Sequence, residues 1–390
     1  MNKIAIRVDA NEIVATGHIM RCRTIAASLK QMGCAVVFVS ADDNILPYIG
    51  DDYEVQILGS NWRRMESEVP VLLGLLKEEE IRTLLVDSYQ VTMPYFEMLR
   101  NGGIRVMYMD DMLKEVYPVK AIVNYSPGAP ELGYEEKYAE DMPMLLLGTK
   151  YIPLREQFWK RRAFAAGMTE EQKEERYGTD GELLMNIDLV ADENEEASAG
   201  AHRAYGFGEG LNNIFLTTGG ADSRGLSEIL ITAILTEPEL GFRDKDKKKI
   251  HVLAGRYYRV SDKVQRYIED GYVILHQNVD NVADIMGCCD VAITPAGTTL
   301  YELCAVGVPS VSYVFAENME PDALYFEKKK LIPYAGDFRN DERLVIMNIM
   351  TTLRKYSEMS IDERAEIGEK LKAVIDGQGA DRIAEALAEL

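Results

Sequence analysis

Apolar residues along the first 150 positions gather in short runs that are separated by longer amphipathic stretches. Runs such as KIAIRVD, CAVVFVS and RTLLVDS are rich in β-branched residues and have the length of buried strands. The stretches between them show helical spacing, as in HIMRCRTIAASLKQMG, which ends at Gly33. Strands that alternate with helices predict a parallel sheet covered on both faces, and we place a Rossmann-like domain at residues 1–150.

The same alternation returns in the second half of the chain. The runs NIFLTT, KIHVLAG, GYVILHQ, CDVAITP and PSVSYVF are typical of strands, and helical patterns separate them. They predict a second Rossmann-like domain at residues 211–340. Residues 341–390 carry apolar positions at helical spacing, which predicts a helical tail. The expected fold class is therefore α/β, with two domains that each contain a parallel sheet.

Residues 151–210 have a different character from the two predicted domains. The segments EEQKEERYGTDGE and ADENEEASAGA combine charge runs with small residues, around one apolar stretch, LLMNIDLV. Charge runs of this kind are usually solvated. We interpret the whole stretch as an interdomain segment whose acidic excursion covers residues 163–210.

The net charge and the length of the apolar runs argue against nucleic-acid binding and against a membrane span. The chain has 43 basic and 64 acidic residues and a formal net charge of -21, which disfavours nucleic-acid binding because such proteins cluster Lys and Arg against phosphates. The longest apolar runs fall short of the roughly 18 residues that a membrane-spanning helix needs, so no membrane span is predicted. The expected partner is a small molecule, and the sequence does not fix an oligomeric state.

The cysteines and the first residues favour a cytoplasmic protein. The five cysteines are odd in number, form no CxxC pair and stand mostly in apolar patterns, as reduced buried thiols do. MNKIAIRVDA enters a predicted strand directly, without the features of an export signal. We therefore expect a reducing cytoplasmic location.

Metal and cofactor signatures are absent from the sequence. The four histidines are scattered without metal-ligand spacing, and the cysteines complete no ligand set, so no metal site is predicted. There is also no GxxxxGK[ST], GxGxxG or GxSxG motif. Phosphoryl transfer, dinucleotide redox chemistry and hydrolase triads lack their signatures, and we expect no bound cofactor.

Gly17 and His18 stand where a predicted strand passes into a helix, within the motif DANEIVATGHIMRC that Asp9 opens. Free backbone N–H groups at a helix amino end favour anions, so a phosphate or sugar oxygen can dock there. The positive end of the helix also disfavours a charged imidazole, which leaves His18 able to accept a proton. The alternative is that His18 only caps the helix or forms a structural hydrogen bond.

Two glycine-containing loops in the second half are candidates for binding a ligand. Gly219 and Gly220 follow a predicted strand, where they allow close approach of a ligand but are equally typical of a tight turn. The segment AGTTLYE is more specific, because a small-residue loop and two threonines open a helix. Its Glu302 can accept hydrogen bonds from the paired hydroxyls of a ribose, or it can simply complement the helix dipole.

Acidic and aromatic residues end two further predicted strands. Asp87 and Tyr89 follow one strand in VDSY, and Asp110 and Asp111 follow the next in MYMDD. The carboxyl ends of parallel strands form the ligand-binding edge of such sheets. These residues can line that edge, or they can cap helices.

Taken together, DANEIVATGHIMRCRTIA, VDSY, MDD, LLGTKYIPLREQF, TTGGAD and AGTTLYELCAVGVPS resemble the UDP-sugar hydrolases of pseudaminic acid biosynthesis. The resemblance runs in order across most of the chain. AGTTLYE is also distantly similar to the lipid II-forming N-acetylglucosaminyltransferase. Both families have the GT-B architecture of two facing Rossmann-like domains, so the resemblance implies that fold with a cleft that binds a UDP-sugar.

The resemblance implies a metal-independent hydrolysis of UDP-2,4-diacetamido-2,4,6-trideoxy-β-L-altropyranose to UDP and the free sugar. His18 matches the family's glycine-histidine motif and would be the general base for water, with Tyr89 beside it. Asp9 and Gly17 complete the expected catalytic set. The residues expected to hold the nucleotide are Gly219, Gly220, Gly297, Thr298, Thr299, Glu302 and Asn318.

Three positions depart from the family's pattern and keep other functions open. Ala15 and Ala296 replace usual glycines, and Met319 stands where an amide is usual. One alternative is a GT-B glycosyltransferase that moves a sugar from a UDP-sugar donor to an acceptor. The other is a nucleotide-sugar binding protein without catalytic activity.

Overall fold

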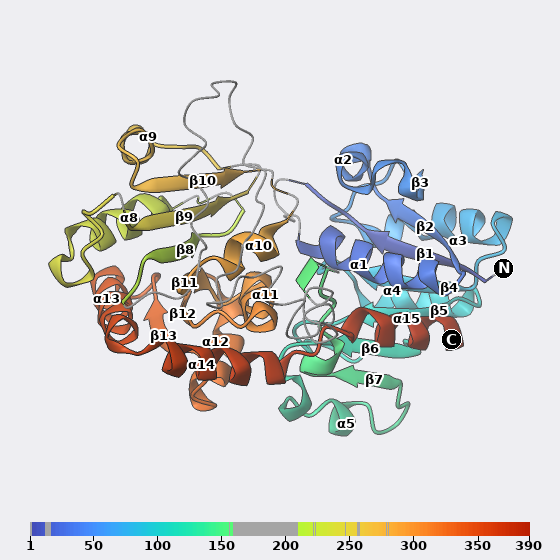
Figure 1. The fold of residues 1–390 in the computed structure, drawn as a ribbon. Helices are drawn as coiled ribbons and strands as arrows, with labels where there is room; N and C mark the ends of the chain where they lie inside the picture. The colour runs from blue at the N-terminus through green and yellow to red at the C-terminus, as the bar shows by residue number, and fades with distance from the viewer. Residues whose placement is uncertain are drawn as a thin grey trace, which may run out of the picture. The chain divides into compact units, whose positions relative to one another are not determined.

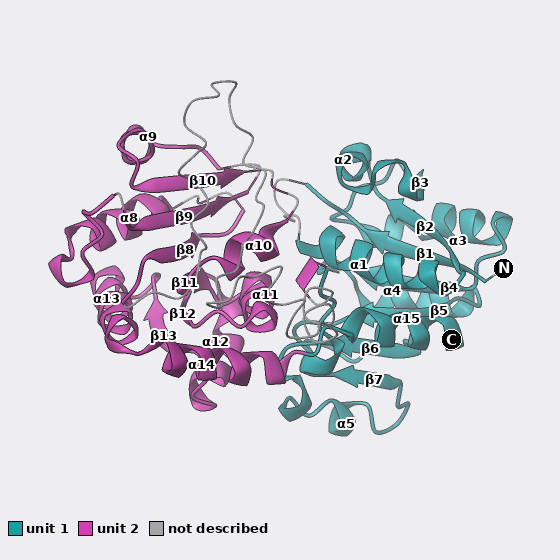
Figure 2. Cartoon of the chain, in the orientation of Figure 1, with its two compact units in different colours: residues 1–156, 376–390 teal, residues 157–375 magenta. Residues whose placement is uncertain are grey.

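The computed structural model describes residues 2–11, 17–155, 157–158, 210–220, 222, 224–245, 247–255, 258–277, 279 and 281–390. The predicted acidic excursion, except Gly210, lies outside the described residues, and so does the stretch LLMNIDLV. The chain divides into two compact units (Figure 2). Unit 1 holds residues 1–156 and 376–390, and unit 2 holds residues 157–375.

Unit 1 is built on a seven-stranded parallel sheet with the strand order β3-β2-β1-β4-β5-β6-β7 (Figure 1). The central strands β1 and β4 are almost entirely buried, as expected for a sheet covered on both faces. The strands are β1 Lys3–Val8, β2 Ala35–Ser40, β3 Glu54–Ile57, β4 Thr83–Asp87, β5 Arg105–Met109, β6 Ala121–Asn124 and β7 Met144–Leu147.

Most helices of unit 1 alternate with the strands, although none is described between β5 and β6 and the last helix comes from the end of the chain. They are α1 Gly17–Gln31, α2 Leu46–Ile49, α3 Val69–Glu78, α4 Met93–Asn101, α5 Tyr134–Lys137 and α15 Gly379–Glu389, with 3-10 turns η1 Asp43–Ile45, η2 Gly50–Asp52, η3 Met65–Glu68, η4 Ala129–Glu131 and η5 Thr149–Tyr151. The first and last helices, α1 in blue and α15 in red, lie side by side in Figure 1. The end of the chain therefore returns to the domain in which it began.

Unit 2 repeats the arrangement with a six-stranded parallel sheet in the order β10-β9-β8-β11-β12-β13. Its strands are β8 Asn213–Thr217, β9 Lys249–Ala254, β10 Val273–Gln277, β11 Val291–Pro295, β12 Ser310–Val314 and β13 Tyr334–Asp337. Its helices are α8 Leu226–Thr236, α9 Asp262–Glu269, α10 Val282–Gly287, α11 Thr298–Val306, α12 Glu320–Lys328, α13 Glu342–Glu358 and α14 Ile361–Val374, with 3-10 turns η7 Pro238–Leu240 and η8 Glu317–Met319.

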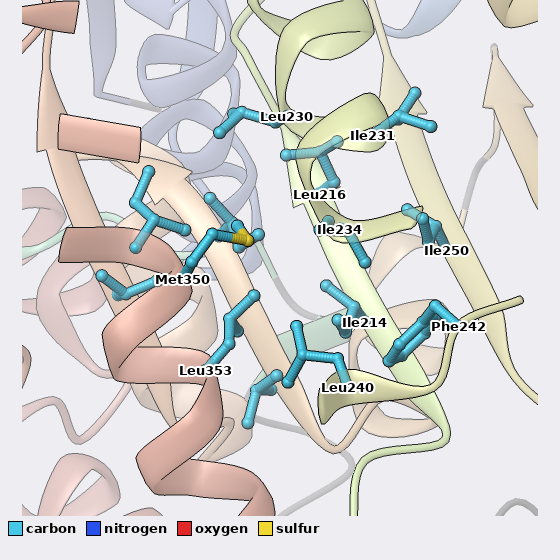
Figure 3. Packing of buried hydrophobic residues seen from close by; sticks show 14 of the residues in the cluster. Ile214, Leu216, Leu230, Ile231, Ile234, Leu240, Phe242, Ile250, Met350 and Leu353 are labelled. Carbon is cyan, nitrogen blue, oxygen red and sulfur yellow. The ribbon is translucent and has the colours of Figure 1, made fainter. Parts of the chain in front are cut away.

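Aliphatic side chains from β8, α8 and α13 form the core of unit 2 (Figure 3). Ile214 and Leu216 point from β8 into this cluster, where Ile234 and Leu353 are also fully buried. Burying each such side chain contributes about 1.5–3 kcal/mol relative to leaving it in water. The core fixes the carboxyl end of β8, from which the first ligand-loop candidate departs.

Both sheets confirm the predicted fold class of two Rossmann-like domains with parallel sheets and a helical tail. In each sheet the strand order reverses beside the first strand, between β1 and β4 in unit 1 and between β8 and β11 in unit 2. Open parallel sheets bind ligands outside the carboxyl ends of their strands at such a reversal. The fold therefore gives each unit one preferred binding edge.

The short strand β13 is the one described strand that the hydrophobic pattern did not predict. Its sequence YAGD contains no β-branched residue, and Gly336 adopts a φ of 120°. Its pairing with β12 also shifts register between Ser312 and Val314. Pairing with a neighbouring strand, rather than local propensity, places this segment in the sheet.

Candidate functional site

His18 and Asp87 meet at the strand-order reversal of unit 1. Asp87 is the last residue of β4, and His18 is the second residue of α1, the helix that follows the neighbouring strand β1. The His18 Nδ1 lies 2.5 Å from Asp87 Oδ1. An ionised carboxylate only accepts hydrogen bonds, so Nδ1 carries the proton and Nε2 is the basic nitrogen. The pair is thus arranged as an imidazole oriented by a carboxylate.

Arg21 connects this pair to a second carboxylate. Its Nε and Nη2 donate to the two oxygens of Asp87 at 2.6 and 2.5 Å, and its Nη1 donates to Asp111 at 3.1 Å and to the hydroxyl of Tyr125 at 2.6 Å. Burial alone would raise the pKa of Asp87, but Arg21 and His18 beside it hold that pKa well below its usual range. Asp87 is therefore ionised at neutral pH.

Tyr89 contacts the His18 ring and also forms a hydrogen bond with Asp111. Its hydroxyl donates to Asp111 Oδ2 at 2.5 Å, and its ring lies edge-on to the imidazole with a centroid distance of 4.7 Å. Desolvation and the charge of Asp111 raise the pKa of Tyr89, so the hydroxyl keeps its proton and acts as a donor. The structure thus brings together His18 and Tyr89 from the sequence analysis, and joins them through Arg21 and Asp111.

Asp9 lies on the opposite side of β1 from this cluster. Its carboxylate accepts hydrogen bonds from the Ala41 amide at 2.9 Å and the Ser40 hydroxyl at 3.1 Å, both at the end of β2. It also pairs with Arg7 at 2.7 Å, and Arg7 is bound in turn by Glu68. These contacts hold Asp9 toward β2, whereas His18 meets Asp87 on the β4 side.

Arg21 and Cys22 are members of the His18 environment that the sequence analysis did not select. Cys22 Sγ donates to Asp87 Oδ2 at 3.4 Å, and burial raises the pKa of that thiol well above its usual value. Both residues follow His18 on α1, three and four positions later, and so face the same side of the helix. The sequence does show this spacing of three and four residues. It points to Arg21 and Cys22 only once β4, which carries Asp87, is known to lie beside α1.

In unit 2 six of the seven predicted nucleotide residues, all except Asn318, lie at the corresponding strand-order reversal. Gly219 and Gly220 follow β8, and Gly297 to Glu302 connect the neighbouring strand β11 to α11. Gly297 is the N-cap of α11 and offers no side chain to the first helical amides. Thr298 is exposed and Thr299 half-buried, while Glu302 is 9% exposed. An anion can therefore reach the amides of the first turn of α11.

The amino end of α8, by contrast, is occupied by a carboxylate of the chain itself. Asp222 accepts hydrogen bonds from the amides of Leu226 at 2.8 Å and Ser227 at 3.1 Å. Asp222 also has a φ of 45°, a left-handed conformation that is uncommon for a residue other than glycine. Of the two helices that follow the strands at the reversal, α8 and α11, the second is the one whose amino end is suited to an external anion.

The glycine loop after β8 is in backbone contact with the loop after β9. A Cβ atom added to Gly255 would lie 2.3 Å from the carbonyl oxygen of Gly220, so only glycine fits at position 255. Gly219 has a φ of 89°, a backbone conformation that residues with a side chain rarely adopt. Sequence reasoning missed Gly255, because the contact joins two strand ends that are far apart along the chain.

Asn318 lies in η8 after β12, and its side chain is outside the described residues.

Two further observations concern the described part of the chain only. There, no group of three or more His, Cys, Asp or Glu side chains is arranged to hold a metal ion. Among the same residues, no helix has both the length and the apolar character required to cross a bilayer. All five cysteines lie among these described residues, where they are buried and form no disulfide.

No family model matches the chain. Among curated proteins, an uncharacterized protein of Methanocaldococcus jannaschii is 21% identical over 317 residues, which make up 79% of this chain and 55% of that protein. The chain thus spans about half the length of the curated relative that it matches.

Solved structures with the same fold are more informative. MurG of Acinetobacter baumannii is similar over the whole of both chains, with a TM-score of 0.62 and 12% identity. The UDP-GlcNAc 2-epimerase of Neisseria meningitidis, solved with UDP-GlcNAc bound, is similar over the whole of both chains, with a TM-score of 0.59 and 12% identity. The spinosyn rhamnosyltransferase SpnG in complex with thymidine diphosphate has a TM-score of 0.55 and 12% identity, over 99% of this chain and 100% of its own. These similarities establish the GT-B type of fold.

Proposed function

We propose that this protein hydrolyses a UDP-sugar, with His18 as the general base that activates water. The observation that carries the proposal is the buried contact between His18 and Asp87 at the binding edge of unit 1. It leaves Nε2 as a proton acceptor on an oriented imidazole, which is the equipment that general-base catalysis requires. Support for a nucleotide sugar comes from structures of the same fold that hold UDP-GlcNAc or thymidine diphosphate.

In the proposed reaction water attacks the anomeric carbon while His18 Nε2 takes its proton. Asp87 stabilises the imidazolium that forms, because it is already ionised and accepts the Nδ1 proton in a hydrogen bond. The bond between the anomeric carbon and the diphosphate oxygen breaks, and UDP leaves. Holding UDP by backbone dipoles makes it a good leaving group without a metal ion.

Unit 2 is proposed to bind the UDP part of the substrate. The amides of the first turn of α11, together with the hydroxyls of Thr298 and Thr299, would receive the diphosphate. Glu302 would accept hydrogen bonds from the ribose hydroxyls. Gly219, Gly220 and Asn318 are proposed to line the same nucleotide, as their positions in the sequence motif suggest.

The proposed substrate is UDP-2,4-diacetamido-2,4,6-trideoxy-β-L-altropyranose, with UDP and the free sugar as products. This finer assignment rests on the resemblance of the GH motif and of AGTTLYE to the hydrolases of pseudaminic acid biosynthesis. On the same basis we propose that the free sugar is a precursor of a nonulosonic acid.

The test is to incubate the protein with this UDP-sugar and to follow UDP by chromatography. Wild-type protein should release UDP in water alone, His18→Ala should lose turnover, and Glu302→Ala should bind UDP more weakly by about 1.5–3 kcal/mol, the usual worth of a charged hydrogen bond. Undiminished turnover by His18→Ala would refute the mechanism. Unchanged UDP affinity in Glu302→Ala would remove Glu302 from the site.

A glycosyltransferase is the second candidate, because MurG and the spinosyn rhamnosyltransferase share the fold. Such an enzyme would release UDP only when an acceptor is present. Assaying the same UDP-sugar with and without candidate acceptors separates the two functions, since hydrolysis needs water alone.

A further inference from the structure

The position of Tyr89 is not determined by core packing. Its residue is 44% exposed and stands in a turn after β4, so the hydrophobic interior does not hold its ring. What the structure does provide is the hydrogen bond from its hydroxyl to Asp111 Oδ2. The same side chain makes the edge-on contact with His18, at 4.7 Å between centroids, so the hydrogen bond ties Asp111 to that contact.

Asp111 accepts hydrogen bonds from the Arg21 guanidinium, which also binds Asp87. It follows β5, the strand beside β4, so both carboxylates reach the same edge of the sheet. Arg21 Nη1 lies 3.1 Å from each oxygen of Asp111, while its Nε and Nη2 engage Asp87. Arg21 therefore links two chains of hydrogen bonds, one through Asp87 to His18 and one through Asp111 to Tyr89.

The carboxylates of Asp87 and Asp111 favour the positive charge that His18 gains when it accepts a proton in the proposed reaction. Asp87 and Asp111 contribute two negative charges against the single positive charge of Arg21. The cluster is therefore neutral only when His18 is protonated. Removing Asp111 would remove the excess negative charge and release the Tyr89 ring from the imidazole.

We propose that Asp111 is a positioning residue for the reaction, which holds Tyr89 against His18 and shares Arg21 with Asp87. This inference rests on the proposed function, since it assigns to Asp111 the orientation of the proposed base. With its ring on one side of the imidazole and Asp87 bonded to Nδ1, Tyr89 restricts rotation of His18 and keeps Nε2 aimed at one point.

Two variants remove the same hydrogen bond from opposite ends. Asp111→Ala and Tyr89→Phe should each lower kcat about 10- to 100-fold with KM little changed, as expected for loss of a charge-assisted hydrogen bond. The double variant should be no slower than the slower single variant, because both changes break one interaction. Glu115→Ala, an exposed carboxylate on the same loop, is the control and should keep wild-type kcat.

A second measurement reports on positioning without any substrate. The ring current of Tyr89 should displace the NMR resonance of the His18 Cε1 proton, and Asp111→Ala and Tyr89→Phe should both change that shift while Glu115→Ala leaves it in place. Tyr89→Phe alters an exposed side chain, so its result stands even if Asp111→Ala fails to fold.

A wild-type His18 resonance and wild-type kcat in Tyr89→Phe, or in folded Asp111→Ala, would overturn the assignment of Asp111. Failure of the proposed function has a different signature. In that case His18→Ala would keep full turnover, whatever the His18 resonance shows in the Asp111 and Tyr89 variants.

Discussion

At the scale of single residues, the contact between Asp87 and His18 decides which imidazole nitrogen is basic. Asp87→Asn keeps the size of the side chain, but its amide can donate to Nδ1 and so favour the wrong tautomer. We expect kcat to fall by about two to four orders of magnitude, as for other oriented imidazole bases. Steady-state kinetics on the UDP-sugar measures the effect. Unchanged kcat in folded Asp87→Asn would show that the carboxylate does not orient the base.

UDP binding provides the internal control for this variant. Because the diphosphate is proposed to bind unit 2, Asp87→Asn should bind UDP as tightly as the wild-type protein does in calorimetry. A parallel loss of UDP affinity would instead point to a general disturbance of the structure.

Two buried histidines of unit 2 are expected to make the free energy of unfolding depend on pH. His251 and His276 lie on neighbouring strands with Nδ1 and Nε2 3.0 Å apart, and desolvation lowers the pKa of His251 to about 3 and that of His276 to about 4. Because both stay neutral in the folded protein, the unfolded chain binds more protons below its ordinary histidine pKa of about 6.5. The free energy of unfolding should therefore fall as the pH drops from about 6.5 toward 4.

Denaturant unfolding at pH 7, 6 and 5 checks this prediction. At pH 5 the loss for buried His251 should reach about 2 kcal/mol, from about one and a half pH units at 1.36 kcal/mol each. His276→Gln should flatten the pH dependence by removing one of the two titrating groups. The same slope in wild type and variant would show that the histidine pair does not cause the loss.

At the scale of elements, the loops after β8 and β9 behave as one structure. In Gly255→Ala the new methyl group would collide with the Gly220 backbone, so the loop after β8 must move. We expect UDP affinity to fall about tenfold or more, since a misplaced loop loses hydrogen bonds worth about 1 kcal/mol each. Calorimetric titration with UDP tests this. Gly103→Ala, a glycine of positive φ in unit 1 with open space around it, is the control for loss of stability.

Affinity for UDP that is equal in Gly255→Ala and wild type would separate the β8 loop from the nucleotide. A loss shared by Gly103→Ala would attribute the effect to strain in the backbone instead.

The alternation of apolar runs was sufficient to predict every described strand except β13, because buried parallel strands leave a continuous apolar signal. It also placed Asp87 and Tyr89 at the end of a strand and His18 at the start of the first helix. It could not predict Arg21 as the link between Asp87 and Asp111, since that link requires α1, β4 and β5 to be adjacent. The sequence analysis also did not select Asp222 as the group that occupies the amino end of α8, although the amides that it binds follow only four and five residues later.

At the scale of the whole molecule, the last helix belongs to the first unit. The helical tail was expected from its periodicity, but periodicity does not say which domain a helix joins. A Cβ atom added to Gly379 would lie 2.2 Å from the Ile152 carbonyl oxygen, and Arg382 donates to the Lys150 carbonyl at 2.7 Å. Close backbone contact and a hydrogen bond therefore fix α15 onto unit 1.

Truncating a buried side chain of α15 should destabilise unit 1 in particular. Leu387 is fully buried, so Leu387→Ala should lower the free energy of unfolding by about 2–5 kcal/mol. Glu385→Ala, an exposed change on the same helix, should have little effect. Hydrogen exchange resolves which unit is affected. Wild-type protection of β1 and β4 amides in Leu387→Ala would mean that α15 contributes little to unit 1.

In the proposed mechanism, water activated by His18 attacks the anomeric carbon and not the diphosphate. Turnover of the UDP-sugar in water enriched with oxygen-18, followed by mass spectrometry of the UDP, tests it most directly. Attack on carbon predicts that UDP forms without an added acceptor and contains no label, because its oxygen atoms all come from the substrate. Labelled UDP, or no UDP until an acceptor is supplied, would contradict the account.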